Sequence, residues 1–358
     1  MLVVNAGSSS LKLALVGEGD ETLGEREIET HRGELDTAQL EAAIATLEDA
    51  DAVGHRIVHG GTRFTAAALI DERVEAELRA LAELAPLHQA KSLAALDAVS
   101  AARPDLPAVA CFDTAFHAGL PAAASTYALP AEWRARWPLR RYGFHGLSHA
   151  WVARRAAALA GNPDARIISC HLGAGASLCA IAAGRSVDTT MGFTPLEGLV
   201  MASRSGSIDP GLVLWLTAAG RLSHAAVEEG LERESGLSGL AGTADMREIL
   251  ARADPQATLA LDVYVHRLAG AIAAMAASLG ALDVLAFTGG VGENAAVVRE
   301  RAVARLGFFG IELDPARNRN ALADAEIGAS GAGARVFVLR TREDLEIARQ
   351  VRDLLAVS

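Results

Sequence analysis

A local pattern occurs twice in this chain, with starts about 165 residues apart, and it constrains the fold more than any other feature. Each copy is a pair of apolar, strand-forming runs joined by a turn of small residues. The runs are 2–4 and 11–16 around Asn5–Ser10, then 166–172 and 178–182 around Gly173–Ser177, followed by a third strand at 184–189. Such a pattern predicts a β-hairpin, and its recurrence predicts a duplicated domain.

The segments between the hairpins have apolar residues at helical spacing. We expect helices over 72–84, 148–159, 258–279 and 343–355. Ser148 and Thr341 are the predicted N-caps of the second and the last of these. Strands that are repeatedly followed by helices predict an α/β architecture.

The length of 358 residues corresponds to about two domains. No linker rich in proline or of low complexity divides them, so we place the boundary near residue 147, before the Ser148 helix. The expected parts are an N-terminal domain (1–147), a C-terminal domain (148–341) and a last helix (342–358) that packs back on the first domain.

Charge and hydropathy argue against several classes of protein. The net charge of −11 comes without a basic block, so we expect neither nucleic acid nor an anionic membrane surface as a partner. The N-terminus lacks the pattern of a signal peptide. The longest uncharged apolar helix candidate, 268–282, is shorter than the ~20 residues of a membrane span, which leaves it as a core or interface helix. Cys111, Cys170 and Cys179 form no disulfide framework and indicate buried thiols and a cytoplasmic location.

The first hairpin carries groups that a phosphate needs. Ser8 and Ser10 add hydroxyl donors to the N–H groups of the turn. Lys12, one of only two lysines among the 33 basic residues, adds positive charge on the strand face opposite the leucines. The Gly173–Ser177 turn repeats the arrangement. A hairpin that binds nothing remains the alternative for each turn.

Further candidates follow other strand-like runs. Arg56 ends a strand before a glycine pair and suits an anionic substrate, and Asp113 ends a buried strand, where it holds Mg²⁺ or caps the next helix. His145 lies just outside a predicted helix N-terminus, where anions bind. Arg204 stands in a serine- and glycine-rich stretch that builds no core, and the glycines of 289–294 leave room for an adenosine. For each of these the alternative is an ordinary loop, cap or strand end.

In the order of the chain, these motifs resemble those of the acetate kinase family, within the group that shares the actin, hexokinase and Hsp70 ATPase core. The matching segments are Asn5–Lys12, Gly54–Gly61, Ala85–His88, Phe112–His117, Arg141–His149, Cys170–Leu178, Asp188–Pro210, Phe287–Asn294 and Thr341–Arg349. The resemblance implies two duplicated α/β domains of actin-like ATPase (ribonuclease H-like) fold with a central nucleotide cleft. It also implies Mg²⁺- or Mn²⁺-dependent phosphoryl transfer between ATP and a short carboxylate such as acetate, giving an acyl phosphate and ADP, in a homodimeric enzyme.

The resemblance also implies roles for individual residues. The expected catalytic residues are His145, Arg56, Arg204 and Asp113, with His145 and Arg204 stabilising the transition state, and the magnesium side has Asn5 and Glu343 beside Asp113. The expected acyl pocket has Arg56, Val58, Leu87, Phe144 and Pro195, and His88 lies on the phosphate side. The expected nucleotide site has Ser8, Ser10, Lys12, His171, Gly173, Gly175, Asp245, Met246, Arg247, Gly290, Val291, Gly292 and Asn294. Phosphoryl transfer passes through a loose transition state that needs positioning and cations more than covalent help. We therefore expect direct in-line transfer rather than a covalent enzyme intermediate.

Three departures from the family pattern affect these expectations. Ala174 replaces the usual Asn of the second turn, and a lost hydrogen bond there weakens nucleotide binding or turnover by roughly 0.5–1.5 kcal/mol. Gln89-Ala90 replaces Asn-Pro after His88, which predicts a less rigid loop. The chain is also about 40 residues shorter than usual, mostly between residues 16 and 52.

Three alternatives remain open on the sequence. The first is a propionate or butyrate kinase, since one methylene gives only ~1–3 kcal/mol of discrimination. The second is a nucleotide-binding member of the family with impaired catalysis. The third is a metal-dependent hydrolase with His55, His59, His145 and His149 as ligands, against which stands the lack of a motif such as H-E-x-x-H.

Overall fold

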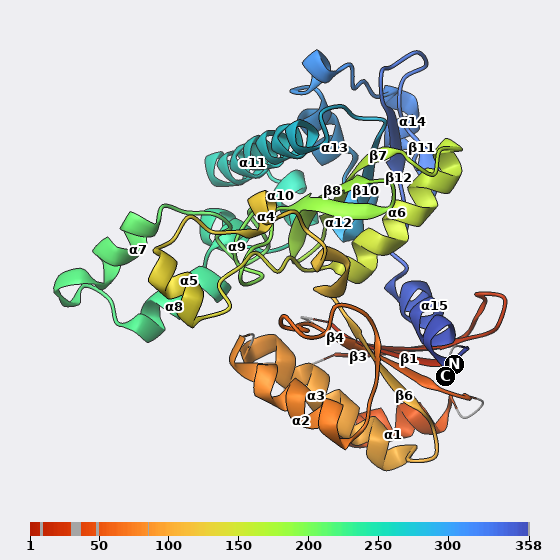
Figure 1. Ribbon diagram of the computed structural model, residues 1–358. Coiled ribbons are helices and arrows are strands. Elements are labelled where there is room, and N and C mark those ends of the chain that lie inside the picture. The colour runs from red at the N-terminus through yellow and green to blue at the C-terminus, as the bar shows by residue number, and fades with distance from the viewer. Residues whose placement is uncertain (8–9, 30–36, 48–49, 85, 357–358) are drawn as a thin grey trace. The chain divides into compact units, whose positions relative to one another are not determined.

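The computed structural model describes residues 1–7, 10–29, 37–47, 50–84 and 86–356. The chain forms two compact units, each with its own mixed sheet of six strands (Figure 1). Unit 1 comprises Met1–Gly119, Phe144–Trp151 and Arg342–Ser358, and unit 2 comprises Leu120–Gly143 and Val152–Thr341. The expected boundary near residue 147 falls within helix α6 (Gly146–Ala160), which begins in unit 1 and continues in unit 2.

The sheet of unit 1 has the strand order β3-β2-β1-β4-β6-β5. Its strands are β1 (Leu2–Ala6), β2 (Ser10–Val16), β3 (Thr22–Glu29), β4 (Val53–Ile57), β5 (Ala68–Leu69) and β6 (Ala108–Phe112). The hairpin strands β1, β2 and β3 pair antiparallel, β1, β4 and β6 pair parallel, and β5 is antiparallel to β6.

The sheet of unit 2 repeats this topology. Its strands are β7 (Arg166–Leu172), β8 (Ala176–Ala182), β9 (Arg185–Thr189), β10 (Val284–Thr288), β11 (Ala325–Glu326) and β12 (Arg335–Val338), in the order β9-β8-β7-β10-β12-β11. Each neighbouring pair has the same sense as its counterpart in unit 1. The predicted hairpins, the duplication and the α/β fold class are therefore confirmed.

The first hairpin forms because alternate residues meet two different cores. Leu11 and Leu13 pack with Leu2 in one apolar cluster, whereas Val3 and Ala14 join the opposite one. The N–H of Gly7 donates to the Ser10 carbonyl oxygen (2.9 Å) and closes the turn.

Helices connect and cover the strands. In unit 1 they include α1 (Thr37–Ala45), α2 (Glu72–Ala80), α3 (Pro86–Ala102) and α15 (Glu343–Leu355), with 3-10 turns at Leu81–Leu84 and Ala115–His117. In unit 2 they include α4 (Ala122–Ser125), α5 (Ala131–Arg136), α7 (Pro210–Thr217), α8 (His224–Arg233), α9 (Gly236–Ala241), α10 (Met246–Ala251), α11 (Pro255–Leu279), α12 (Gly289–Asn294), α13 (Ala296–Val303) and α14 (Pro315–Arg319), with 3-10 turns at Ala218–Gly220 and Gly307–Phe309.

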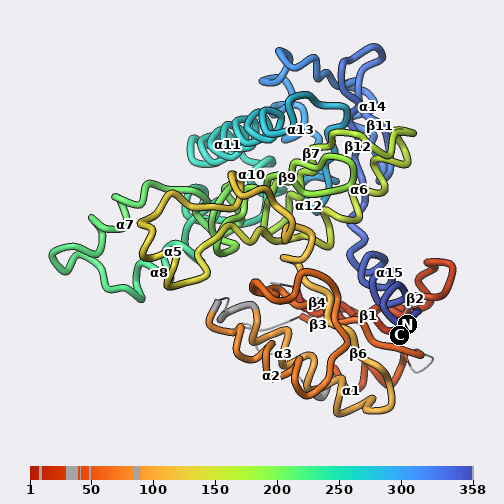
Figure 2. Tube along the Cα trace, viewed as in Figure 1, coloured from red at the N-terminus to blue at the C-terminus, as the bar shows by residue number. Residues whose placement is uncertain are grey.

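The last helix, α15, returns to the sheet that the N-terminus begins. It packs on β1 and β4, as the blue helix beside the red strands in Figure 2 shows. Its apolar face, which includes Ile347 and Val351, is buried. A Cβ at position 54 would lie 2.5 Å from Ile347 Cγ2, so Gly54 permits this close packing. The predicted span is correct but the predicted cap is wrong, because Arg342 and not Thr341 occupies the N-cap position.

Helix α11 meets the length and composition of a membrane span, and among the described residues it is the one helix that does. Ten of its 25 residues are buried within unit 2, where it packs against β8, α9 and α13. A one-sided burial of this kind is typical of a core helix.

Candidate active site

Four polar side chains from distant parts of the sequence meet in unit 1. Nε and Nη2 of Arg56 donate to Oδ2 of Asp113 at 3.1 and 2.6 Å. Nη1 of Arg56 donates to Oδ1 of Asn5 (3.1 Å), and Nδ2 of Asn5 donates to Oε2 of Glu343 (2.8 Å). The same Nη1 lies 3.9 Å from that Glu343 oxygen. The sequence placed all four in the site, and the fold brings them together at the ends of β1, β4 and β6 and the start of α15.

Asp113 is buried, and its partner Arg56 is largely shielded from solvent, with 12% of its side chain exposed. Asp113 is 1% exposed, and its Oδ1 has no hydrogen-bond partner among the described residues. Burial raises the pKa of the Asp113 carboxyl, and the Arg56 guanidinium opposes that shift. Burial also lowers the pKa of Arg56, but Asp113 and Glu343 outweigh it and raise the pKa overall. The cluster therefore holds a permanently charged guanidinium between two carboxyl groups.

This donor set suits a magnesium ion. Mg²⁺ is usually bound by one or two carboxylates together with waters and substrate phosphates. Asp113 has a buried oxygen without a partner, and Glu343 and Asn5 offer further oxygens beside it. Among the described residues no group of three or more His, Cys, Asp or Glu side chains is placed to hold a metal, so a site here depends on two carboxylates and on ligands from outside the protein.

His145 is attached to this cluster through the backbone. The N–H of Gly146, the first residue of α6, donates to the carbonyl oxygen of Asp113 (2.9 Å). A Cβ at position 146 would lie 2.1 Å from that oxygen, so only glycine fits. His145 itself has a left-handed backbone conformation (φ 56°), which is uncommon for a residue with a side chain and is typical of functional sites. Because α6 begins at Gly146, the expectation that Ser148 caps it is wrong.

The predicted phosphate residues of the first hairpin contact a carboxylate. Ser10 Oγ donates to Oε1 of Glu27 on β3 (2.6 Å), and Lys12 Nζ lies 3.7 Å from the same oxygen. A phosphate that binds both Ser10 and Lys12 competes with Glu27, a residue that no sequence pattern singled out. Ser8 lies outside the described residues.

The acyl-pocket residues of unit 1 are described in part. Val58 and Phe144 are buried, at 7% and 1% exposure, and the Phe144 carbonyl oxygen lies 3.0 Å from Nε2 of His117. The side chains of Leu87 and His88 lie outside the described residues, although both belong to α3.

Gln89 is held more firmly than the sequence suggested. Its fully buried amide accepts from the N–H of His59 (3.2 Å) and donates to the carbonyl oxygens of His59 (3.3 Å) and Leu78 (3.4 Å). The expected loose loop is a helix, because α3 begins at Pro86. The Gln89 side chain fastens that helix to the backbone that follows β4.

A second group of predicted residues gathers in unit 2 at the ends of β7 and β10. His171 is the register partner of Thr288, so the turn Gly173–Gly175 and helix α12 follow neighbouring strand ends. The N–H of Gly173 donates to the Gly175 carbonyl oxygen (2.9 Å). The glycine-rich segment expected to be a turn is itself helical, and Asn294 Nδ2 donates to the Gly290 carbonyl oxygen (2.8 Å). Within α12, Gly290 and Asn294 are exposed, Val291 is half-buried and Gly292 is buried.

Arg204 is a buried cation of unit 2. It is 9% exposed, and its Nη1 donates to the carbonyl oxygen of Pro195 (2.8 Å). Burial lowers its pKa, and Glu232 opposes the shift. The structure thus joins two residues, Arg204 and Pro195, that the sequence assigned to catalysis and to the acyl pocket.

The remaining nucleotide candidates surround the start of α10. Asp245 caps this helix, and its carboxylate pairs with Arg247 (2.6 Å). The Arg247 side chain is 89% exposed, whereas Met246 is buried. Asp245 and Arg247 therefore form a local surface pair.

Two residues that the sequence did not single out fasten α12. Arg299, 2% exposed, donates to the carbonyl oxygens of Gly292 (2.8 Å) and Glu293 (2.9 Å), and to the side-chain and backbone oxygens of Asn318. The Glu293 carboxylate binds backbone outside the helix. The sequence feature that could have drawn attention to Glu293 is that it is a carboxylate within a glycine-rich segment.

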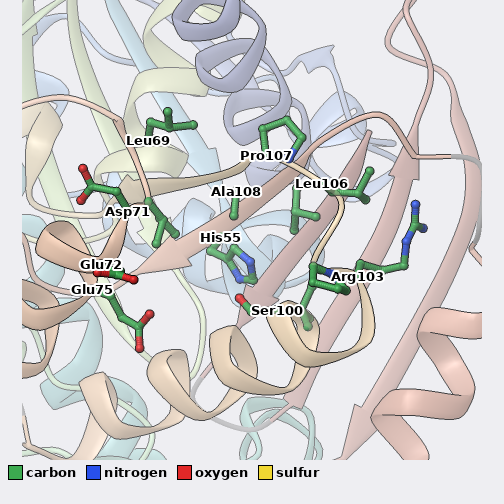
Figure 3. A pocket seen from close by; sticks show the side chains of 14 residues that line it. His55, Leu69, Asp71, Glu72, Glu75, Ser100, Arg103, Leu106, Pro107 and Ala108 are labelled. Atoms are coloured by element: carbon green, nitrogen blue, oxygen red, sulfur yellow. The ribbon is translucent and has the colours of Figure 1, made fainter.

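A hollow of about 340 Å³ in unit 1 is separate from these groups (Figure 3). It is lined by residues of α2, α3, β4 and β6, and His55 points into it. His55 and Arg56 are successive strand residues and point to opposite faces of the sheet, so the hollow does not include the Arg56 cluster.

The duplicated sheets and the polar strand ends define a two-unit α/β protein of the actin-like ATPase class. The Acetokinase family model matches residues 24–349. An acetate kinase of Deinococcus deserti is 44% identical and covers 99% of this chain and 98% of its own length. A propionate kinase of Francisella tularensis (34% identical, TM-score 0.90, 98% of each chain) and an acetate kinase of Porphyromonas gingivalis (34%, 0.88, 99% of each) have similar structures. The chain belongs to the acetokinase family and is a kinase, which excludes the hydrolase alternative.

Proposed function

We propose that the protein catalyses reversible phosphoryl transfer between ATP and acetate, giving acetyl phosphate and ADP. Its membership of the acetokinase family supports the reaction class. The observation that carries the assignment to a working enzyme is the cluster of Asn5, Arg56, Asp113 and Glu343. Removing a guanidinium and two carboxyl groups largely from solvent costs stability, and a catalytic role accounts for a cluster that carries this cost.

Phosphoryl transfer needs positioning and positive charge more than covalent chemistry. Arg56 and Arg204 supply guanidinium donors suited to carboxylate and phosphoryl oxygens. His145, beside the N-terminus of α6, supplies a further donor near the anion-binding end of a helix. We therefore assign Arg56 to binding and orienting the carboxylate, and Arg204 and His145 to the charge of the transferred group, in a direct in-line transfer.

A divalent cation completes this assignment. Asp113, Glu343 and Asn5 are the residues that would hold Mg²⁺, or Mn²⁺ in its place. When bound, such an ion neutralises charge on the phosphate oxygens. Without it, Arg56 keeps the two carboxyl groups close together by its contacts to both.

On the nucleotide side, we assign adenosine to the exposed backbone of α12 and to Asp245, Met246 and Arg247, and phosphates to the two hairpin turns. The exposed Gly290 lacks a Cβ, so a flat ring can approach the backbone there. Ser10, Lys12 and His171 flank the turns on the phosphate side.

For the acyl group we assign the small apolar pocket to Val58, Leu87, Phe144 and Pro195. The relatives include both acetate and propionate kinases. Since one methylene changes the binding free energy by only ~1–3 kcal/mol, propionate or butyrate is the alternative substrate.

The test is acyl phosphate formation trapped as hydroxamate, with ATP, Mg²⁺ and acetate, propionate or butyrate in turn. Arg204→Ala is the negative control, and Arg267→Ala, at an exposed position of α11, is the matched arginine control. A signal with acetate that Arg204→Ala loses and Arg267→Ala keeps supports the proposal. If the protein binds nucleotide but forms hydroxamate with none of the acids, it is instead a family member with impaired catalysis. Ala174 and Gln89 are then the first positions to change to the usual residue of the family.

We also propose that the enzyme is a cytoplasmic homodimer. Its three cysteines are buried free thiols, as the sequence predicted, and burial raises the pKa of each. Helix α7 presents neighbouring exposed apolar side chains, with Leu214 70% and Trp215 55% exposed. Light scattering after size exclusion should show a dimer that Leu214→Glu weakens and that Leu259→Glu, at a 55% exposed position on α11, does not.

A further inference from the structure

Residue 341 is the point at which the chain passes from unit 2 to unit 1. Thr341 is the last residue of unit 2, and Arg342 is the first of the final segment of unit 1. On the unit 2 side, the N–H of Leu339 donates to the Phe287 carbonyl oxygen (2.8 Å) and that of Arg340 to Asp324 (3.2 Å). On the unit 1 side, Arg342 pairs with Asp344. The change of unit therefore takes place across one peptide bond.

Thr341 is held by the glycine-rich helix α12. Oε1 of Glu293 accepts from the Thr341 N–H (3.0 Å) and from the Thr341 hydroxyl (3.1 Å). The Thr341 hydroxyl oxygen in turn accepts from the Gly289 N–H (2.9 Å), which also lies 3.2 Å from Glu293 Oε1. Three of these four contacts end on a carboxylate, and charge-assisted hydrogen bonds are the stronger kind.

The proton positions in this group follow from the number of donors. A hydroxyl has one proton and a carboxylate has none to give. The Thr341 proton is therefore donated to Glu293, and the buried Thr288 hydroxyl, 2.8 Å from Thr341 Oγ1, donates to Thr341. Every donor in the group has an acceptor, so the arrangement has one orientation.

Two residues beyond Thr341, the chain reaches the polar cluster of unit 1. Glu343 begins α15, accepts from Asn5 and lies beside Arg56. The chain therefore connects the Thr341–Glu293 group to Glu343 through the single residue Arg342. Glu293, which holds Thr341, belongs to α12, the helix to which we assign adenosine.

We propose that Glu293 and Thr341 are positioning residues that couple nucleotide binding at α12 to the placement of Glu343. A nucleotide that orders α12 fixes Glu293, Glu293 fixes Thr341, and Thr341 fixes the first turn of α15. Neither residue touches the phosphoryl group in this scheme. The inference rests on the proposed nucleotide site, and by thermodynamic linkage a metal bound by Glu343 tightens nucleotide binding in return.

The first experiment measures amide hydrogen exchange with and without ADP in the segments 289–294 and 342–347. In the unaltered protein, ADP should slow exchange in both segments. Thr341→Val, which keeps the side-chain shape without the hydroxyl, should keep the slowing in 289–294 and lose it in 342–347. Thr341→Ser keeps the hydroxyl and should behave like the unaltered protein, whereas Glu293→Gln, which removes the charge from the acceptor, should weaken the slowing in 342–347.

The second readout is the Mg²⁺ concentration that gives half-maximal activity. It should rise about tenfold in Thr341→Val, as expected for a lost hydrogen bond to a charged group, while the dissociation constant of ADP in the absence of Mg²⁺ changes less than twofold. Slowing in 342–347 that persists in Thr341→Val, with an unchanged Mg²⁺ requirement, would overturn the coupling. In the unaltered protein, slowing in 289–294 alone contradicts the coupling only, and slowing in neither segment contradicts the nucleotide site as well.

Discussion

Two nitrogens of Arg56 donate to one oxygen of Asp113, and the other oxygen of that carboxyl group is buried without a partner among the described residues. Two donors on Oδ2 fix the carboxyl plane, so Oδ1 is presented in a defined direction. A carboxylate arranged in this way is already oriented for a ligand, and no side chain has to move to free it.

Removing the Asp113 carboxyl group should therefore affect both stability and activity. In Asp113→Ala, the buried Arg56 loses its closest counter-charge, and leaving one member of a buried pair unpaired costs about 3–5 kcal/mol. Urea unfolding measures this loss. Asp105→Ala, which removes the exposed partner of Arg103, should change the free energy of unfolding by less than about 1 kcal/mol. Equal losses in the two variants would contradict a special role for the Arg56–Asp113 pair.

Arg204 should matter for turnover and not for folding alone. Its Nη1 donates to a backbone carbonyl, and the rest of the guanidinium forms no ion pair within the described residues, so positive charge remains for an anion. Arginines that stabilise phosphoryl transfer contribute about 10³–10⁵ in kcat. We expect Arg204→Ala to lower kcat by about 10³ and Arg204→Lys by less, measured as acetyl phosphate formation. A kcat within tenfold of the unaltered enzyme in Arg204→Ala would remove this residue from the mechanism.

His55 should make the protein less stable in mild acid. Burial lowers its pKa to about 4, below the ordinary value near 6.5. Between these values the unfolded chain binds a proton that the folded chain does not, so this contribution to stability is complete above pH 6.5 and is lost as the pH falls towards 4. From pH 7 to pH 5 it amounts to about 1–2 kcal/mol.

Urea unfolding at the two pH values checks this. His55→Leu should reduce the difference in unfolding free energy by that amount, whereas His224→Leu, at an exposed position in α8, should leave it unchanged. The prediction fails if both variants keep the full pH dependence.

Gln89 should be a structural residue of α3. Gln89→Ala leaves two buried backbone groups of His59 and one of Leu78 without their partner. Each unsatisfied buried group costs about 1–3 kcal/mol, so with three groups affected we expect a loss of at least about 3 kcal/mol in the free energy of unfolding. Gln256→Ala, at an exposed position in α11, serves as control and should lie within about 0.5 kcal/mol of the unaltered protein. An equally small effect of Gln89→Ala would mean that the backbone groups find other partners.

Much of the fold could be predicted because it depends on local patterns. The hairpins at both unit starts follow from period-two apolar runs around small-residue turns, and α15 follows from helical spacing over 343–355. The family resemblance supplied the site residues, since its motifs are short and lie at strand and helix ends. By contrast, the N-caps predicted at Ser148 and Thr341 were wrong, because tertiary contacts decided both ends. Gly146 binds Asp113, and Thr341 binds Glu293.

Local patterns in the sequence predict the two hairpins, several of the helices, the duplication of the fold and the set of polar residues at the strand ends. Which of these residues meet depends on how the elements pack in three dimensions. Asn5 and Glu343 are 338 positions apart and 2.8 Å from each other. No periodicity or spacing carries that contact, because it arises when α15 packs on β1 and β4. The same holds for Glu293, whose carboxylate stands in a glycine-rich segment but acts on a threonine 48 residues further along the chain.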